Sequence, residues 1–249
     1  MFFPLCGLRC LLALMLAWST AAAAQELKVA MIQLDPWTIK NPDANSPVQY
    51  VGIVPDLLDE LERRSSFKTR RTLTPYARVE LDLENGMVDF AIMAWGEIRA
   101  RYADKGVTLV QLEFGVRARK GVPIKRYEDL REIITSATRG LRIDPRFDVD
   151  ETVRKDYVLD YSTGIRKTVA GHDSQAVAGS LSTINAIIRK NRLEEQFGDT
   201  LLLRTVPLTA AFSKRGVGYA QANAVGAVFK AMVEDGTAQR IYDSWMNRP

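Results

Sequence analysis

The feature that most constrains the fold is an alternation of strand-like and helix-like segments between residues 27 and 93. β-Favouring residues alternate with the period of a strand over 27–32, and a helix follows Gly52, with Pro55 in its first turn. The series continues with a strand over 68–73, a helix carrying Val79 and Leu83, and an apolar strand over 88–93. Such an order predicts an α/β protein in which helices pack on the faces of a largely parallel sheet.

Two long extended runs, 109–119 and 201–213, enclose the middle of the chain. Between them the α/β pattern starts again, with a short helix from Tyr127, a strand over 133–138 and a turn at Gly140. This pattern favours two α/β lobes joined by two extended crossings. One larger doubly wound sheet is the alternative, and the pattern alone leaves both open.

The end of the sequence predicts two helices separated by a glycine. Val225, Val228, Phe229 and Met232 are spaced as one helical face, as are Ile241, Tyr242 and Trp245. We expect Gly236 to end the first helix and Thr237 to cap the second.

Residues 1–24 differ from the rest and resemble a secretory signal peptide. Arg9 precedes an apolar run over 11–18, and four alanines over 21–24 supply small residues for cleavage. The run is shorter than the ~20 residues of a spanning helix. A retained signal anchor is the alternative. A lipoprotein is disfavoured because Cys6 and Cys10 do not follow the apolar run. We therefore expect export to the periplasm, with about 225 residues left.

Composition then excludes several classes of function. Both cysteines lie in the signal segment, so disulfides, thiol nucleophiles and thiolate metal sites are not expected. His172 is the single histidine, and we expect neither a metal nor a cofactor. It makes a catalytic pair with Asp173 conceivable, although an exposed loop pair is favoured. Loss of Arg9 lowers the net charge from +4 to +3, too little for a nucleic-acid-binding protein.

Several segments together resemble the family 3 bacterial extracellular solute-binding proteins over 27–246. The strongest is 229–246, in which a Gly-Thr turn separates a helix from a short helix with Tyr and Trp. The stretches 50–57, 85–90 and 99–104 are also similar. The resemblance implies two lobes around a ligand cleft, which we place at 25–116 plus 208–249 and at 117–207. It also implies that the protein closes on a small solute by hinge motion.

The resemblance and the strand ends together indicate the first-lobe side of a ligand site. Ligands of α/β sheets lie beyond the carboxyl ends of strands. Asp35 and Trp37 follow the first strand, Tyr76 the second, and Ala94 and Gly96 the third. The family often places aromatic rings over the ligand near Trp37 and Tyr76. The alternative is that each ring fills the core of its own lobe.

Arg99 corresponds to an arginine that in this family binds a ligand carboxylate through two parallel hydrogen bonds. Arg101 is the alternative position for this arginine, because the alignment of this segment with the family can be shifted by two residues. A solvated charge at the start of a helix is the alternative for either residue.

Departures from the family concern the polar groups around the ligand. Ala94 and Gly96 replace the usual hydroxyl residues, and the second-lobe turn contains Arg139 and Gly140 where Gly-Thr or Gly-Ser is usual. The stretch 178–182, with Ser180 at its centre, lacks the aspartate that pairs an α-ammonium group. An unpaired buried ammonium costs several kcal/mol. A standard α-amino acid is therefore not expected, and arginines on both lobes, Arg99 and Arg139, instead suggest an anionic solute such as an organic acid.

We expect a monomer that presents its solute to a membrane transporter or a membrane sensor, without nucleic-acid partners. One alternative is a periplasmic dehydratase-like enzyme on the same fold, with His172, Asp35 or Glu97 as acid or base. The other is a partner-binding protein whose solute site has been lost.

Overall fold

A computed structural model of the protein describes residues 26–171 and 173–248. The predicted signal peptide and His172 lie outside the described residues. Within these two ranges, no helix combines the length and the apolar character needed to cross a membrane.

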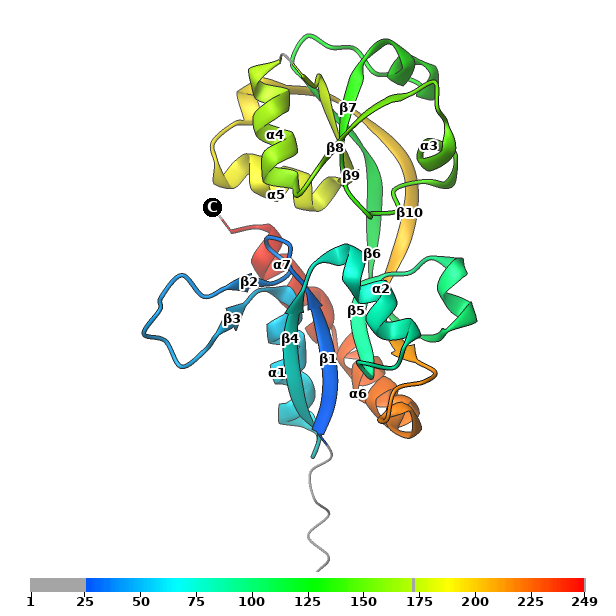
Figure 1. Cartoon of the computed structure of the whole chain (residues 1–249). Helices are drawn as coiled ribbons and strands as arrows, with labels where there is room; N and C mark the ends of the chain where they lie inside the picture. Colours follow the sequence, from blue (N-terminus) through cyan, green and yellow to red (C-terminus); the bar gives the residue numbers. More distant parts are fainter. Residues whose placement is uncertain (1–25, 172, 249) are drawn as a thin grey trace, which may run out of the picture.

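An eight-stranded sheet runs through the molecule in the order β4-β1-β5-β10-β6-β9-β7-β8 (Figure 1). Its strands are β1 (Glu26–Ile32), β4 (Lys68–Thr74), β5 (Phe90–Ala94), β6 (Ala103–Arg119), β7 (Ile134–Thr138), β8 (Arg154–Val158), β9 (Ala176–Ser180) and β10 (Phe197–Ser213). The short strands β2 (Ile39–Lys40) and β3 (Tyr50–Val51) form a separate hairpin. The helices are α1 (Ile53–Arg64), α2 (Tyr76–Glu84), α3 (Pro145–Val149), α4 (Tyr161–Ala170), α5 (Leu181–Lys190), α6 (Ala222–Glu234) and α7 (Thr237–Met246), with short 3-10 turns at Glu97–Arg101, Tyr127–Glu132, Glu194–Gln196 and Tyr219–Gln221.

The first lobe contains β1 to β5, α1, α2, α6 and α7. Strands β4, β1 and β5 are parallel, as the alternating sequence predicts. Because neighbouring residues of a strand face opposite sides, Val29 and Met31 pack with the core that includes α1, α6 and α7. Ala30 and Ile32 face the other side of the sheet, where α2 contributes Val79 and Leu83.

The second lobe contains β7, β8, β9, α3, α4 and α5. Strand β7 pairs in parallel with both β8 and β9. Helices α4 and α5 bury one apolar face of this sheet through residues such as Ile165 and Ile184. Phe147 of α3 belongs to the core on the other side.

Strands β6 and β10 are 17 residues each and run antiparallel from one lobe into the other (Figure 1). In the first lobe β5 pairs with 208–212 of β10, and in the second lobe β9 pairs with 114–118 of β6. The protein therefore has the two-lobed α/β fold. Residues 111–113 of β6 and 205–207 of β10 lie between the segment that pairs with β5 and the segment that pairs with β9. The residue boundaries of the two lobes stay predictions.

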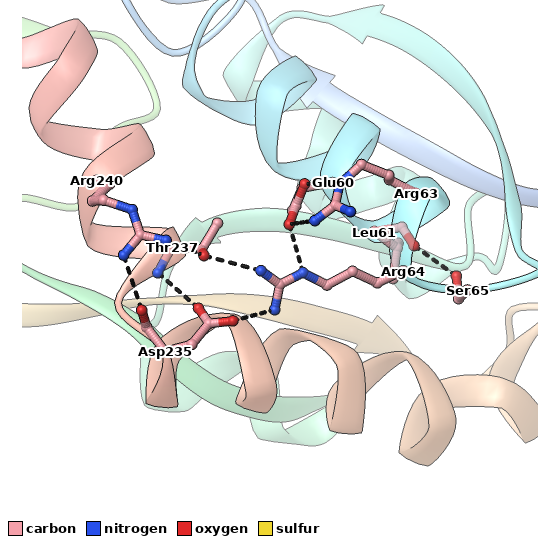
Figure 2. Close-up of polar contacts among 8 residues, drawn as sticks. All are labelled: Glu60, Leu61, Arg63, Arg64, Ser65, Asp235, Thr237 and Arg240. Carbon is pink, nitrogen blue, oxygen red and sulfur yellow. Dashed lines mark hydrogen bonds and ion pairs between the residues drawn. The ribbon is translucent and has the colours of Figure 1, made fainter.

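The first lobe is assembled from the two ends of the chain, and Arg64 joins them (Figure 2). At the end of α1, its Nε lies 2.5 Å from Glu60, and its other nitrogens donate to Asp235 at 2.6 Å and to Thr237 at 2.9 Å. Hydrogen bonds from Arg63 and Arg64 lower the pKa of Glu60 to about 2, so this carboxylate remains charged at neutral pH.

The turn between α6 and α7 differs from the sequence prediction in one respect. Gly236 is the N-cap of α7, with φ +75, and Thr237 is the first residue of that helix. The Thr237 hydroxyl does not cap the helix, because it accepts hydrogen bonds from Arg64 and from Arg240, the latter at 2.6 Å. The predicted role of Thr237 as a cap is therefore wrong.

Candidate functional site

Two connected hollows lie between the lobes, at the carboxyl ends of the strands. The outer one, here called the mouth cavity, has a volume of about 510 Å³ and is lined from both lobes, by Asp35 and Lys40 of the first and by Asp160 of the second. The inner one, here called the deep pocket, has a volume of about 40 Å³. Leu34, Tyr76 and Tyr161 line both hollows, so they form the boundary between the two.

The lining of the deep pocket is almost entirely apolar. The strands and the crossing segments contribute Ile32, Ile92, Met93, Leu112, Phe114 and Leu208. Among the polar residues at its wall are Trp37, Tyr76, Tyr161 and Ser180. Ala94, one of the predicted site residues, also lines this pocket, and its contact with a ligand stays a prediction.

Side chains from the two lobes contact each other across the cleft. The indole N–H of Trp37 donates to Thr183 Oγ1 at 2.9 Å in a buried hydrogen bond. At the rim, Lys190 Nζ lies 2.7 Å from Asp35 Oδ2. The guanidinium of Arg189 donates to the backbone carbonyl of Met246. Helix α5 of the second lobe is thus bound to the loop after β1 and to the end of α7.

Trp37 combines the two roles considered for it from the sequence. Its side chain is buried and belongs to the large core of the first lobe, with the ring of Tyr242 at a centroid distance of 5.9 Å. The same residue lines the deep pocket and bonds to the second lobe. Asp35, in contrast, lines the mouth cavity and is paired with Lys190.

Arg99 faces the interior of the first lobe. Its side chain is only 2% exposed. The guanidinium donates to Glu80 through Nε at 3.0 Å and again through Nη2, to the Ala94 carbonyl at 2.7 Å and to the Tyr76 hydroxyl at 3.2 Å. Glu80 also accepts from the Tyr102 hydroxyl. We call Arg99, Glu80, Tyr76 and Tyr102 the arginine cluster.

The charges of the arginine cluster stabilise one another. Burial alone lowers the pKa of Arg99, but the interactions with Tyr76 and Glu80 outweigh it and raise that pKa. Burial also raises the pKa of Tyr76, which therefore stays a neutral phenol. The expectation that Arg99 binds a ligand carboxylate is thus not supported by this geometry, because four of the five N–H groups of its guanidinium donate to protein partners. Ligand binding by Arg99 stays a prediction.

The second-lobe side of the cleft is built from hydroxyl groups, here called the hydroxyl network. Ser180 is the N-cap of α5, and its Oγ lies 3.0 Å from Thr183 Oγ1 and 3.1 Å from Ser182 Oγ. The Ser180 N–H donates to the Tyr161 hydroxyl at 2.9 Å. A Cβ at Gly179, where φ is +151, would lie 2.3 Å from the Tyr161 ring, so only glycine allows this approach.

Besides Arg99, four predicted residues do not line the deep pocket or the mouth cavity. Gly96 precedes the turn that carries Arg99, and Arg101 is exposed. Arg139 is also exposed, which does not support the expectation of an arginine from each lobe in the cleft. Gly140 has φ +83 and lines a separate second-lobe cavity of about 250 Å³. A Cβ there would lie 3.2 Å from the Cβ of Ala77 in the first lobe.

Sequence reasoning missed Tyr161, Thr183 and Lys190, as well as Leu141, which lines the deep pocket. Tyr161 starts α4 just after β8, and Thr183 lies in the first turn of α5 after β9. Both positions lie beyond the carboxyl ends of strands, where ligands of α/β sheets bind, as in the first lobe. The sequence of β8, however, has no clear alternating pattern from which the end of this strand could be predicted. Lys190 lies at the far end of α5, where no sequence signal marks it as a partner of Asp35.

The candidate acids and bases are not arranged as a catalytic pair in the part of the chain that the structure describes. Asp35 is paired with Lys190, and Glu97 is exposed and accepts from the Trp95 indole at 3.0 Å. Within residues 26–171 and 173–248, no group of three or more His, Cys, Asp and Glu side chains is placed to hold a metal ion.

The two-lobed fold and the cleft at the strand ends agree with a comparison of the sequence with known families. Residues 27–248 match the sequence profile of the bacterial extracellular solute-binding proteins, family 3. The chain belongs to this family. A comparison with curated protein sequences gives no match.

Solved structures of this family's fold resemble the chain over most of its length. An ancestral arginine-binding protein bound to arginine has a TM-score of 0.73 at 19% identity, over 88% of this chain and 97% of that one. A histidine kinase sensor domain with similarity to periplasmic binding proteins has a TM-score of 0.75 at 16% identity, over 90% and 97%. An ancestral amino-acid-binding protein, a precursor of cyclohexadienyl dehydratase, has a TM-score of 0.71 at 19% identity, over 89% of this chain and 96% of that one. At these identities the likeness establishes the fold.

Proposed function

We propose that this family 3 protein is exported to the periplasm, binds a small carboxylate-bearing solute between its lobes, and delivers it to an importer or reports it to a membrane sensor. The observation that carries the proposal is the mouth cavity of about 510 Å³, which both lobes line at the strand ends. Its size lies within the ~300–1,000 Å³ of small-molecule sites. The structural neighbours include both a transporter's substrate-binding protein and a sensor domain, which supports either role.

The mouth cavity has charges of both signs, Lys40 against Asp35 and Asp160, so the support for a carboxylate without an α-ammonium group comes from Lys40 and from the deep pocket. Lys40 lines the mouth cavity and, among the described residues, has no carboxylate oxygen within 4.0 Å. Asp35 is already paired with Lys190, and Asp160 accepts from the Thr163 N–H at 2.7 Å as the N-cap of α4. Among the residues that the structure describes, no aspartate or glutamate lines the deep pocket. An ammonium group there would lose its hydration without gaining a counter-charge.

A partner-binding protein without a solute is the second candidate, and one observation favours it. The deep pocket holds only about 40 Å³, and the protein's own side chains already bridge the lobes. On this reading the closed shape itself is what a partner protein recognises.

Thermal unfolding in the presence of solutes separates these functions. Carboxylic acids at about 100 times their Kd should raise the free energy of unfolding by ~2.7 kcal/mol, and zwitterionic amino acids should do less. If no solute in a broad panel shifts the unfolding temperature, the partner-binding reading is correct. Consumption of the best solute on prolonged incubation would instead support a dehydratase-like enzyme.

A further inference from the structure

The polar groups around the deep pocket already have partners within the protein. The Trp37 N–H donates to Thr183, and the Ala94 carbonyl accepts from Arg99. The Ser180 hydroxyl is bonded within the hydroxyl network. A polar group of a solute that entered here would therefore find few free partners, and it would lose its own hydration.

The tyrosines at the boundary of the two hollows differ from these groups. The hydroxyl oxygens of Tyr76 and Tyr161 accept hydrogen bonds from Arg99 and from the Ser180 N–H, respectively. Within the described residues, no acceptor takes the hydrogen of either hydroxyl, so both can donate to a solute oxygen. Burial raises the pKa of both phenols, which keeps these hydrogens in place at neutral pH.

The polarity along the cleft therefore changes from the mouth to the interior. Lys40 lies at the mouth cavity, the two tyrosines line the boundary, and the deep pocket beyond them is apolar. We infer that the solute enters with its hydrocarbon end first, so that an alkyl group occupies the deep pocket while the carboxylate stays at the tyrosines and Lys40. The solute class is then a short-chain monocarboxylic acid. This inference rests on the proposed solute-binding function.

The volume of the deep pocket limits the length of that hydrocarbon end. A protein cavity of ~150 Å³ holds a benzene ring. At about 40 Å³, the deep pocket is too small for a ring and suits a group of methyl or ethyl size. Chain extension should therefore increase affinity only until this space is filled.

Calorimetric titration of the chain without substitutions tests the orientation. Acetate, propanoate, butanoate and pentanoate are compared with glycine, alanine, 2-aminobutanoate and norvaline. Each CH₂ that enters the pocket should tighten binding about fourfold. Each acid should bind at least about tenfold more tightly than its amino counterpart. Equal or tighter binding of the amino acids, or tighter binding of succinate, overturns the inference while the solute-binding function stands. Absence of binding by every compound overturns the inference, and the solute-binding function falls with it only if no solute of the broad thermal-unfolding panel binds either.

A substitution tests whether the preference for chain length arises in the deep pocket. Met93→Ala removes a buried side chain that lines it, so the best chain length should increase by one or two carbons. Met232→Ala is the matched control, because Met232 is a buried methionine of α6 in the same lobe that does not line the pocket. An unchanged preference in Met93→Ala, or the same change in both variants, overturns the inference. If neither variant folds, the ligand series on the unsubstituted chain still decides.

Discussion

The two sides of the cleft are supported by different chemistry. Behind the first-lobe side lies the arginine cluster, in which the buried Arg99, paired with the partly exposed Glu80, holds the Tyr76 hydroxyl. Behind the second-lobe side lies the hydroxyl network, which contains no charge and holds Tyr161 through the Ser180 N–H. Each side thus positions one tyrosine at the boundary of the deep pocket, one by charge and one by neutral hydrogen bonds.

The difference shows that a charge near a cleft is not necessarily offered to the ligand. The arginine cluster faces inward, so its positive charge contributes to the stability of the first lobe. The hydroxyl network faces the first lobe across the cleft, and its Thr183 hydroxyl accepts a hydrogen bond from the Trp37 N–H of that lobe. Contact between the lobes accordingly depends on the neutral Trp37–Thr183 bond in the interior, on the bond from Arg189 to the Met246 carbonyl, and on the ion pair at the rim.

The largest effect is expected from Arg99→Ala. Removal of the buried guanidinium leaves the partly exposed Glu80 without its counter-charge and the Ala94 carbonyl without its donor, which should lower the free energy of unfolding by at most about 3–5 kcal/mol. Denaturant unfolding measures this loss. Arg101→Ala is the control, since an exposed arginine should change stability by less than about 0.5 kcal/mol. Normal stability with lost solute binding in Arg99→Ala would show that this arginine serves the ligand.

An intermediate effect is expected from the bond between Trp37 and Thr183. In a double-mutant cycle of Trp37→Phe and Thr183→Val, the coupling should be about 1 kcal/mol, as for a neutral buried hydrogen bond. Unfolding by denaturant again gives the energies. A coupling near zero would mean that the lobes do not stay in contact in solution.

The smallest effect on stability is expected from Lys190→Ala. This rim ion pair is partly exposed, with the lysine side chain 55% exposed, so its loss should cost less than about 1 kcal/mol. The cleft should nevertheless open more often, which small-angle scattering detects as a larger radius of gyration. Arg192→Ala provides an exposed control just beyond α5. Equal radii for both variants would argue against a role of the rim ion pair in closure.

The sequence predicts the fold better than the site because the two depend on different signals. Apolar periodicity locates β1, α1, β4 and α2 to within a few residues, since each element must bury a continuous face. The direction of a single side chain is not periodic. Arg99 is correctly located after β5, but only the position of Glu80 on α2 shows that its guanidinium turns inward. Contacts such as that of Lys190 with Asp35 join residues far apart in the chain and leave no local pattern.

The bridge made by Arg64 also determines when each lobe can form during synthesis. Its partners Asp235 and Thr237 are 171 and 173 residues further along the chain. The second lobe consists of a continuous middle segment apart from its share of β6 and β10, so its contacts are available as soon as that segment emerges. The first lobe must wait for α6 and α7, and until then the apolar face of α1 is covered only in part, by the strands of the first-lobe sheet. The N-terminal part of the first lobe is therefore synthesised first, but the first lobe is the last to complete its fold.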